Sequence, residues 1–313
     1  GRRDGHGGHH AERGGSIDTP DARRRWTIGF LAPALHGYFW GNVLMGAIQT
    51  AASRGARVIA IQTFDAGLVD YPDDDRFPAH LAWQRLDALL VGQAAVTDAY
   101  LRAFARTGRP IIAVHRHPGE FPCPTVVPDN RDGVRQAVAH LVGHGHRVIT
   151  FVSRHRAEAD EWLRYHAYRE AMLAHGLEPG EPLLVSWQLD ETHDATAAVR
   201  RLLEHGPLPT AAVACTDLVA LAFVEALAAV GIVVPDDLAV IGFDDIAEAA
   251  SAQPSLSTVA QRFAFSGAMA CGLALDALGG ARVAPGLHCT PVTFVGRRSC
   301  GCPDPTGAGA GNG

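Results

Sequence analysis

Apolar and polar residues follow two different periods along this chain. Short continuous apolar runs, bounded by glycine or polar residues, are typical of strands buried on both faces. Longer stretches in which apolar residues recur every three or four positions are typical of amphipathic helices. One complete unit comprises the apolar run Ala211–Cys215, a helical stretch Leu218–Val230 stopped by Gly231, and a second run Leu238–Phe243. This alternation predicts a parallel sheet covered by helices.

The strand and helix pattern occurs twice in succession. The first series predicts strands over Trp26–Ala32, Arg57–Gln62, Asp87–Val91, Pro110–Val114 and Thr125–Val127, and helices over Trp40–Ser53 and Asp98–Arg106. The second predicts strands over Val148–Ser153 and Leu183–Gln188, and helices over Arg131–Val142, Glu161–His175 and Ala195–Glu204, before the unit above. A strand at Ser257–Gln261, a helix at Phe265–Leu278 and a strand at His288–Val295 follow. Two such series predict two α/β lobes.

Polar residues stand where several predicted strands end. Asp244 and Asp245 follow one strand, and Thr216 and Asp217 follow its neighbour. Because ligands of open parallel sheets bind at the carboxyl ends of the strands, we expect Asp244 to accept hydrogen bonds from ligand hydroxyls. The alternative is that Asp244 or Asp245 caps the turn that follows. Thr216 and Asp217 are also candidate contacts, although we favour Asp217 as the N-cap of the next helix.

A ring-rich segment follows the first predicted strand. Aromatic faces combined with a few directed hydrogen bonds commonly hold sugars and nucleobases. We therefore predict a ligand wall made by His36, Tyr38, Phe39 and Trp40; alternatively, these rings close the core between the lobes. Further candidate contacts are Trp187, at the end of a predicted strand, and Asp129 and Asn130, which could instead only terminate a strand.

Composition narrows the classes of partner. The 313 residues suffice for two domains, and the net charge of −6 gives no support for a nucleic-acid surface. No apolar run approaches the ~20 residues of a membrane span, so no membrane partner is expected. Residues 1–25 and 300–313 have the composition of disordered tails. Six irregularly spaced cysteines predict free thiols in a cytoplasmic setting.

The sequence lacks the common motifs of catalytic and metal-binding sites. The first strand is not followed by G-x-G-x-x-G, and no nucleophile elbow or zincin helix occurs, so we predict neither an enzyme nor a cofactor. The stretch Gly143–Arg147 has no cysteine or carboxylate at ligand spacing and is interpreted as a turn. Cys300 and Cys302 form a close pair for which metal or redox use is a minor alternative, and no metal site is predicted.

Residues 235–245, PDDLAVIGFDD, and 254–261, PSLSTVAQ, resemble the lactose-repressor/galactose-repressor (LacI/GalR) family. The resemblance extends from about Trp26 to about Arg298. It implies an α/β fold of two doubly wound parallel-sheet lobes of the periplasmic-binding-protein-like type, joined by a three-strand hinge. It further implies an N-terminal lobe of residues 26–128 plus 257–287, a C-terminal lobe of residues 129–256 plus 288–299, and a ligand cleft between them.

The same resemblance assigns roles to two side chains. Arg164 matches an arginine that grips ligand hydroxyls or a carboxylate through its planar fork, and Asp244 matches a common effector contact. It also implies a homodimer that binds DNA only through a helix-turn-helix domain, which we do not expect within these residues. The sequence departs from the family where the first loop reads His36–Trp40 and where Thr216 replaces an asparagine, so the effector is not specified.

The leading hypothesis is thus a sensing domain for a sugar or related metabolite in a transcriptional regulator. One alternative is the same sensor coupled to a signalling output domain that does not bind DNA, which the Cys300–Cys302 ending favours. Another is the solute-binding component of a transporter, which gel filtration distinguishes because such components are usually monomers.

Overall fold

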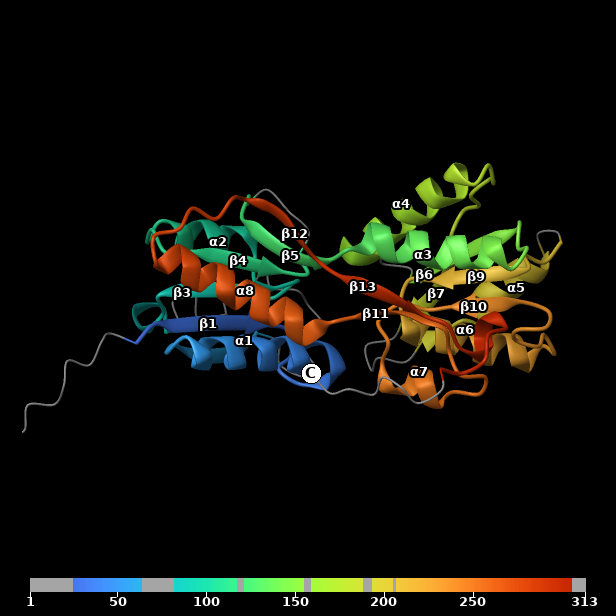
Figure 1. Ribbon diagram of the computed structural model, residues 1–313, viewed down its shortest axis with the longest axis horizontal. Coiled ribbons are helices and arrows are strands. Elements are labelled where there is room, and N and C mark those ends of the chain that lie inside the picture. The colour runs from blue at the N-terminus through green and yellow to red at the C-terminus, as the bar shows by residue number, and fades with distance from the viewer. Residues whose placement is uncertain are drawn as a thin grey trace, which may run out of the picture.

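The computed structural model describes residues 25–63, 82–116, 121–154, 159–187, 193–204 and 207–305. Two α/β halves lie side by side along the long axis of the molecule (Figure 1). Each half has its own sheet flanked by helices, which confirms the predicted α/β class with parallel sheets. Most of residues 1–25 and residues 306–313, expected to be tails, lie outside the described residues.

The first half contains a six-stranded parallel sheet. Its order is β12-β5-β4-β3-β1-β2, from β1 (Thr27–Ala32), β2 (Arg57–Gln62), β3 (Ala88–Gly92), β4 (Ile111–Val114), β5 (Pro124–Pro128) and β12 (Gly286–Thr290). Phe30 and Leu90 face one apolar core together with α1 (Asn42–Ser53) and α8 (Phe263–Leu278). Leu31 and Leu89 face a second core with α2 (Asp98–Ala105). Because both faces are buried, the strands are apolar throughout.

The second half is built on a five-stranded sheet of order β10-β9-β6-β7-β8. Its strands are β6 (Ile149–Arg154), β7 (Leu183–Trp187), β8 (His193–Asp194), β9 (Ala211–Ala214) and β10 (Ala239–Ile241), and only the β7–β8 pair is antiparallel. The helices of this half are α3 (Asn130–Gly143), α4 (Ala159–Ala174), α5 (Thr196–Glu204), α6 (Asp217–Ala229) and α7 (Ala247–Ser251). One apolar cluster joins the sheet to these helices.

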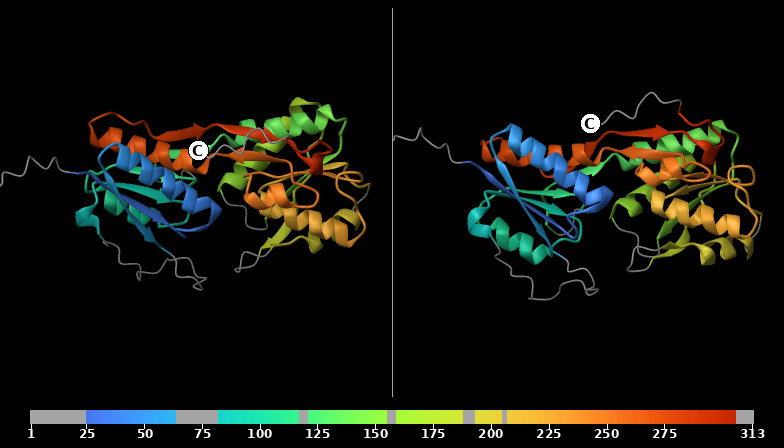
Figure 2. Two further views of the ribbon diagram at one scale, coloured as in Figure 1. Left: turned by 60° about the horizontal axis from the view of Figure 1, so that its bottom comes forward. Right: turned by 90° about the horizontal axis from the view of Figure 1, so that it is seen from below.

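The chain passes between the halves three times (Figure 2). It crosses from β5 to α3, from β11 (Thr258–Gln261) to α8, and from β12 to β13 (Val292–Val295), and β11 pairs with β13 in an antiparallel ribbon. The single strand expected over His288–Val295 is therefore wrong. It is two strands in different sheets, separated at Pro291, which has no N–H to donate to a ladder.

The chain after β13 also departs from expectation. Residues 300–305 were predicted to begin a disordered tail, but the 3₁₀ turn η3 (Arg298–Cys300) packs on the second half and Cys300 is 2% exposed. The Ser299 hydroxyl donates to the carbonyl of Val240, which ties this turn to β10. Within the described residues, no helix combines the length and the apolar character needed to cross a bilayer.

Helices α1 and α8 cross at two glycines. A Cβ on Gly46 would lie 1.8 Å from the carbonyl oxygen of Ala264, and one on Gly267 would lie 1.8 Å from that of Val43. The backbones of the two helices therefore come into direct contact, because each helix has only a glycine at the point where the other helix approaches it. This close approach seals one face of the first sheet.

We expect Gly46→Ala to lower the free energy of unfolding by about 1–3 kcal/mol, since the added methyl group forces the helices apart. Gly272→Ala on α8 is the matched control, because a Cβ there meets nothing within 4 Å. It should raise stability by roughly 0.5–1 kcal/mol. Urea unfolding of the three proteins checks both values, and equal losses in the two variants would contradict the proposed clash.

Candidate functional site

Arg164 lies on the first turns of α4 and is 3% exposed. Its Nε donates to Asn130 Oδ1 at 2.8 Å and its Nη1 donates to the carbonyl of Cys215. Nη1 also lies 3.5 Å from Asp244 Oδ1, and the guanidinium stacks 3.8 Å from the ring centre of Phe243. A buried guanidinium is tolerated here because its Nε and Nη1 donors have partners. These contacts bring Arg164, Asn130 and Asp244 together from three separate elements.

Asp244 follows β10 in a left-handed backbone conformation, with φ of +133°. Its Oδ1 accepts a hydrogen bond from the Gln261 side chain at the end of β11. Burial raises the pKa of Asp244 to about 8, and the nearby Arg164 charge only partly opposes this effect. A non-glycine residue with a positive φ is strained, and such strained residues are common at functional sites. The carboxyl group is thus a proton-bearing group as well as an acceptor near neutral pH.

His115 links the first half to this cluster. It follows β4 with φ of +52°, is fully buried, and its Nδ1 lies 2.7 Å from Asp160 Oδ2 on α4. Asp160 Oδ1 accepts from Asn130 Nδ2 at 3.0 Å. Burial opposes ionisation of Asp160, but the hydrogen bond and charge of His115, with Arg164 and Asn130, outweigh it and lower its pKa. A continuous polar chain therefore runs from His115 through Asp160, Asn130 and Arg164 to Asp244 and Gln261.

Aromatic rings cover the His115 end of this polar chain. Phe39, in the short helical turn η1 (Gly37–Gly41), lies 4.7 Å from the His115 ring and 5.0 Å from Phe263. Tyr38 packs against the cores of both halves, and burial, reinforced by the Asp244 and Asp217 charges, raises its pKa. The Trp40 ring fills the space where Gly92 has no side chain. Only Tyr38 among these rings touches the cores of both halves, whereas Phe39 and Trp40 pack against the core of the first half; contact of any of them with a ligand stays a prediction.

Comparisons with known proteins identify the family of this chain. A family model described as periplasmic binding protein-like domain matches residues 138–300. The HTH-type transcriptional regulator CelR of Thermobifida fusca is 32% identical over 250 residues, which cover 79% of this chain and 72% of that protein. The chain belongs to the LacI family and carries its periplasmic-binding-protein-like domain.

Further relatives of this LacI-family chain agree. The HTH-type transcriptional regulator GalS of Salmonella typhimurium is 33% identical over 220 residues, covering 69% of this chain and 63% of that protein. The solved complex of the transcriptional regulator CelR with cellobiose has a TM-score of 0.73 and 26% identity, covering 88% of this chain and 85% of that one. The chain therefore spans about two thirds of the length of the curated relatives named here, which are regulators of transcription and not enzymes.

Several side chains that the sequence nominated as ligand contacts have protein partners in this LacI-family domain. Asp217 is not the N-cap of α6: Thr216 is, accepting from the Val219 N–H, while Asp217 is buried and accepts from Thr258 Oγ1 at 2.6 Å and the Ile246 N–H at 3.0 Å. Burial raises the pKa of Asp217 to about 6. Sequence spacing missed this because Thr258 lies on a distant strand.

The other acidic candidates also have local roles. Asp129 is the N-cap of α3, with its Oδ1 accepting from the Asp132 N–H at 2.9 Å. Neither Asp244 nor Asp245 caps the following helix α7, whose N-cap is Ile246; Asp245 instead pairs with Arg297 at 2.7 Å. His36 is exposed at the start of η1, and Trp187 ends β7 with a side chain outside the described part of the structure.

Three residues of the polar chain were not singled out from the sequence: His115, Asp160 and Gln261. His115 and Gln261 follow or end predicted strands, so the rule that sites gather at strand ends would have nominated both. Asp160 precedes a predicted helix and had no such signal. His115 Nε2 and Gln261 Oε1 are buried without a hydrogen-bond partner among the described residues.

Proposed function

We propose that this domain binds a small polyhydroxylated effector, a sugar or a related metabolite, between its two halves and thereby senses it for a transcriptional regulator. The polar chain from His115 to Gln261 carries the proposal, because it joins both halves at the carboxyl ends of their strands. The unpartnered His115 Nε2 and Gln261 Oε1 offer further hydrogen bonds to hydroxyl groups. Phe39 and Tyr38 supply apolar faces for a sugar ring.

An effector held by Arg164 and Asp244 on one side and by His115 on the other changes the relative energies of open and closed arrangements of the halves. In a homodimer, that change alters the spacing of the two subunits. DNA binding, dimerisation and a cytoplasmic location are proposals for the whole protein, supported by relatives that are HTH-type regulators. The binding of cellobiose by CelR makes disaccharides a further class to test here.

A thermal-shift screen of monosaccharides, disaccharides, polyols and nucleobases tests the proposal. A ligand at a hundred times its dissociation constant should add about 2.7 kcal/mol to the free energy of unfolding. Asp244→Asn keeps the volume of the side chain but not its charge or proton, and we expect the ligand-induced shift to fall by at least about half.

Asp245→Asn is the matched control, because this adjacent carboxylate pairs with Arg297. Its shift should equal that of the parent when each protein is compared with its own ligand-free baseline. If a compound stabilises both variants as well as it stabilises the parent, the effector site lies elsewhere.

A further inference from the structure

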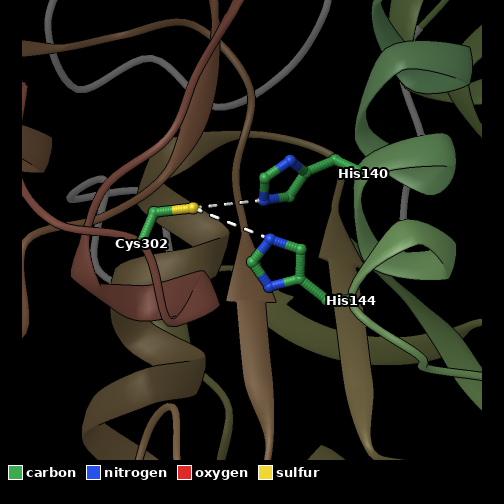
Figure 3. Close-up of side chains that lie close together, drawn as sticks. All are labelled: His140, His144 and Cys302. Carbon is green, nitrogen blue, oxygen red and sulfur yellow. Dashed lines mark hydrogen bonds between the residues drawn. The ribbon is translucent and has the colours of Figure 1, made fainter.

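A second group of polar side chains lies at the far end of the second half, away from the polar chain described above. His140 and His144 stand four residues apart at the end of α3, so both rings lie on one face of the helix. The chain after η3 turns back at Gly301, whose φ is +83°, and brings Cys302 to the same place. Figure 3 shows both imidazole rings directed at the Cys302 sulfur.

The two nitrogen–sulfur separations of this group match a tetrahedral metal site, and all three ligand atoms lie within 4.8 Å of one another. Cys302 Sγ lies 3.5 Å from His140 Nε2 and 3.8 Å from His144 Nε2. With metal–nitrogen bonds near 2.0–2.1 Å and metal–sulfur bonds near 2.3 Å, a tetrahedral zinc ion separates its ligand atoms by roughly 3.3–3.8 Å. The sulfur is thus already placed for both imidazoles, and the set closes around an ion by movements of about 1 Å or less.

A fourth ligand is available next to these three. Cys300 Sγ lies 3.2 Å from His140 Nε2, and its thiol donates to the carbonyl of Arg297. The Phe294 ring, 4.4 Å from the ring of His140, fixes the orientation of that imidazole from β13. Cys302 also lines a surface groove, so an ion can reach the sulfur from solvent.

We propose that His140, His144 and Cys302, completed by Cys300, bind a structural zinc ion. Two imidazoles and two thiolates form a Cys₂His₂ donor set, which favours zinc in tetrahedral geometry over the oxygen-preferring cations. The ion fastens the segment after η3 to the end of α3, at the place where the described chain leaves the second half. The interpretation of Gly143–Arg147 as a turn is confirmed, but the expectation that no cysteine lies at ligand distance from it is wrong, since Cys302 approaches His144 from 158 residues away.

Cobalt substitution tests the site directly. His6, His9 and His10 are first replaced by alanine, so that histidines near the N-terminus contribute no binding. The reduced, metal-free protein is then titrated with Co²⁺. We expect about one equivalent to bind with the charge-transfer absorption of a cobalt–thiolate bond, and Zn²⁺ to displace it.

Matched variants distinguish this site from adventitious binding. Cys302→Ser and His144→Gln should each weaken Co²⁺ binding at least about tenfold, and Cys302→Ser should reduce the thiolate band. Cys289→Ser and His175→Gln change an exposed cysteine and an exposed histidine elsewhere, and should bind like the parent. Far-ultraviolet circular dichroism confirms that each variant remains folded.

A second measurement uses the unaltered chain and needs no variant. Alkylation by iodoacetamide, followed by mass spectrometry, should slow at Cys302 when Zn²⁺ is added and recover with a chelator, while the exposed Cys289 reacts at one rate throughout. Absence of a thiolate band, a band unchanged in Cys302→Ser, or equal alkylation of Cys302 with and without Zn²⁺ would each overturn the proposal. None of these outcomes bears on effector binding at Asp244, which is a separate site.

Discussion

Arg164→Met should lower the free energy of unfolding by about 3 kcal/mol at neutral pH. Methionine retains the apolar contact with Phe243 but donates no hydrogen bond, so Asn130 Oδ1 and the Cys215 carbonyl lose their donor while still buried. Asp244 loses its neighbouring cation as well. Because the pKa of Asp244 is already about 8, its carboxyl group can keep a proton and stay uncharged in the variant. The loss of unfolding free energy should therefore lie near the lower end of the range for breaking a buried ion pair.

Urea unfolding at 25 °C measures the Arg164→Met effect. Arg169→Met is the matched control: it lies on the same helix, is exposed, and should change stability by less than about 0.5 kcal/mol. If the two variants are equally stable, the hydrogen bonds of Arg164 make no net contribution and its role is confined to the ligand.

Stability should fall as the pH rises from about 4 to about 8. The pKa values of Asp244 and Asp217 are raised by burial from 3.8 to about 8 and about 6, so within this range the folded protein retains protons that the unfolded chain has released. Each such proton lowers the free energy of unfolding by about 1.4 kcal/mol per pH unit. Asp160, whose pKa is lowered, acts oppositely, but its contribution is lost only as the pH falls through the acid range. Burial lowers the pKa values of His140 and His146 from 6.5, so these two groups partly offset the fall in stability below about pH 6.5.

The variant Asp244→Asn distinguishes the effect of Asp244 on stability from that of Asp217. The variant has no proton to release at this position, so the decline in stability between about pH 6 and pH 8 should disappear. Both carboxyl groups contribute to the decline between about pH 4 and pH 6, so in the variant this decline should fall to about half, and the remaining Asp217 part serves as an internal control. Unfolding by urea at constant ionic strength across this range provides the measurement, and identical slopes above pH 6 in both proteins would contradict the assignment.

Local pattern was enough to predict the α/β class, the repetition of the strand and helix series, and the placement of Asp244 and Arg164 near one another through the family resemblance. It failed where distant segments decide the outcome. Asp217 looked like a helix cap because an aspartate after a strand commonly is one, but Thr258, forty-one residues away, holds its carboxylate instead. His115 and Asp160 form their contact only when the two halves meet.

The break between β12 and β13 shows the same limit. The stretch His288–Val295 was expected to form one strand, and the pairing of its two parts with β5 and β11 reveals that Pro291 divides it. Cys302 was similarly placed in a disordered tail by its glycine- and proline-rich surroundings, whereas contacts with His140 and His144 hold it against α3.

The three crossings of the chain have a consequence for synthesis. Helix α8 covers one face of the first sheet, and β12 forms its edge beside β5, yet both emerge from the ribosome long after β1 to β5. Until then only α1 packs beside Phe30 and Leu90 on that face, which leaves an incompletely covered apolar surface prone to wrong association. The half that begins first is therefore completed only after most of the second half has been made, and a nascent chain halted before residue 263 should depend on chaperones more than the finished protein does.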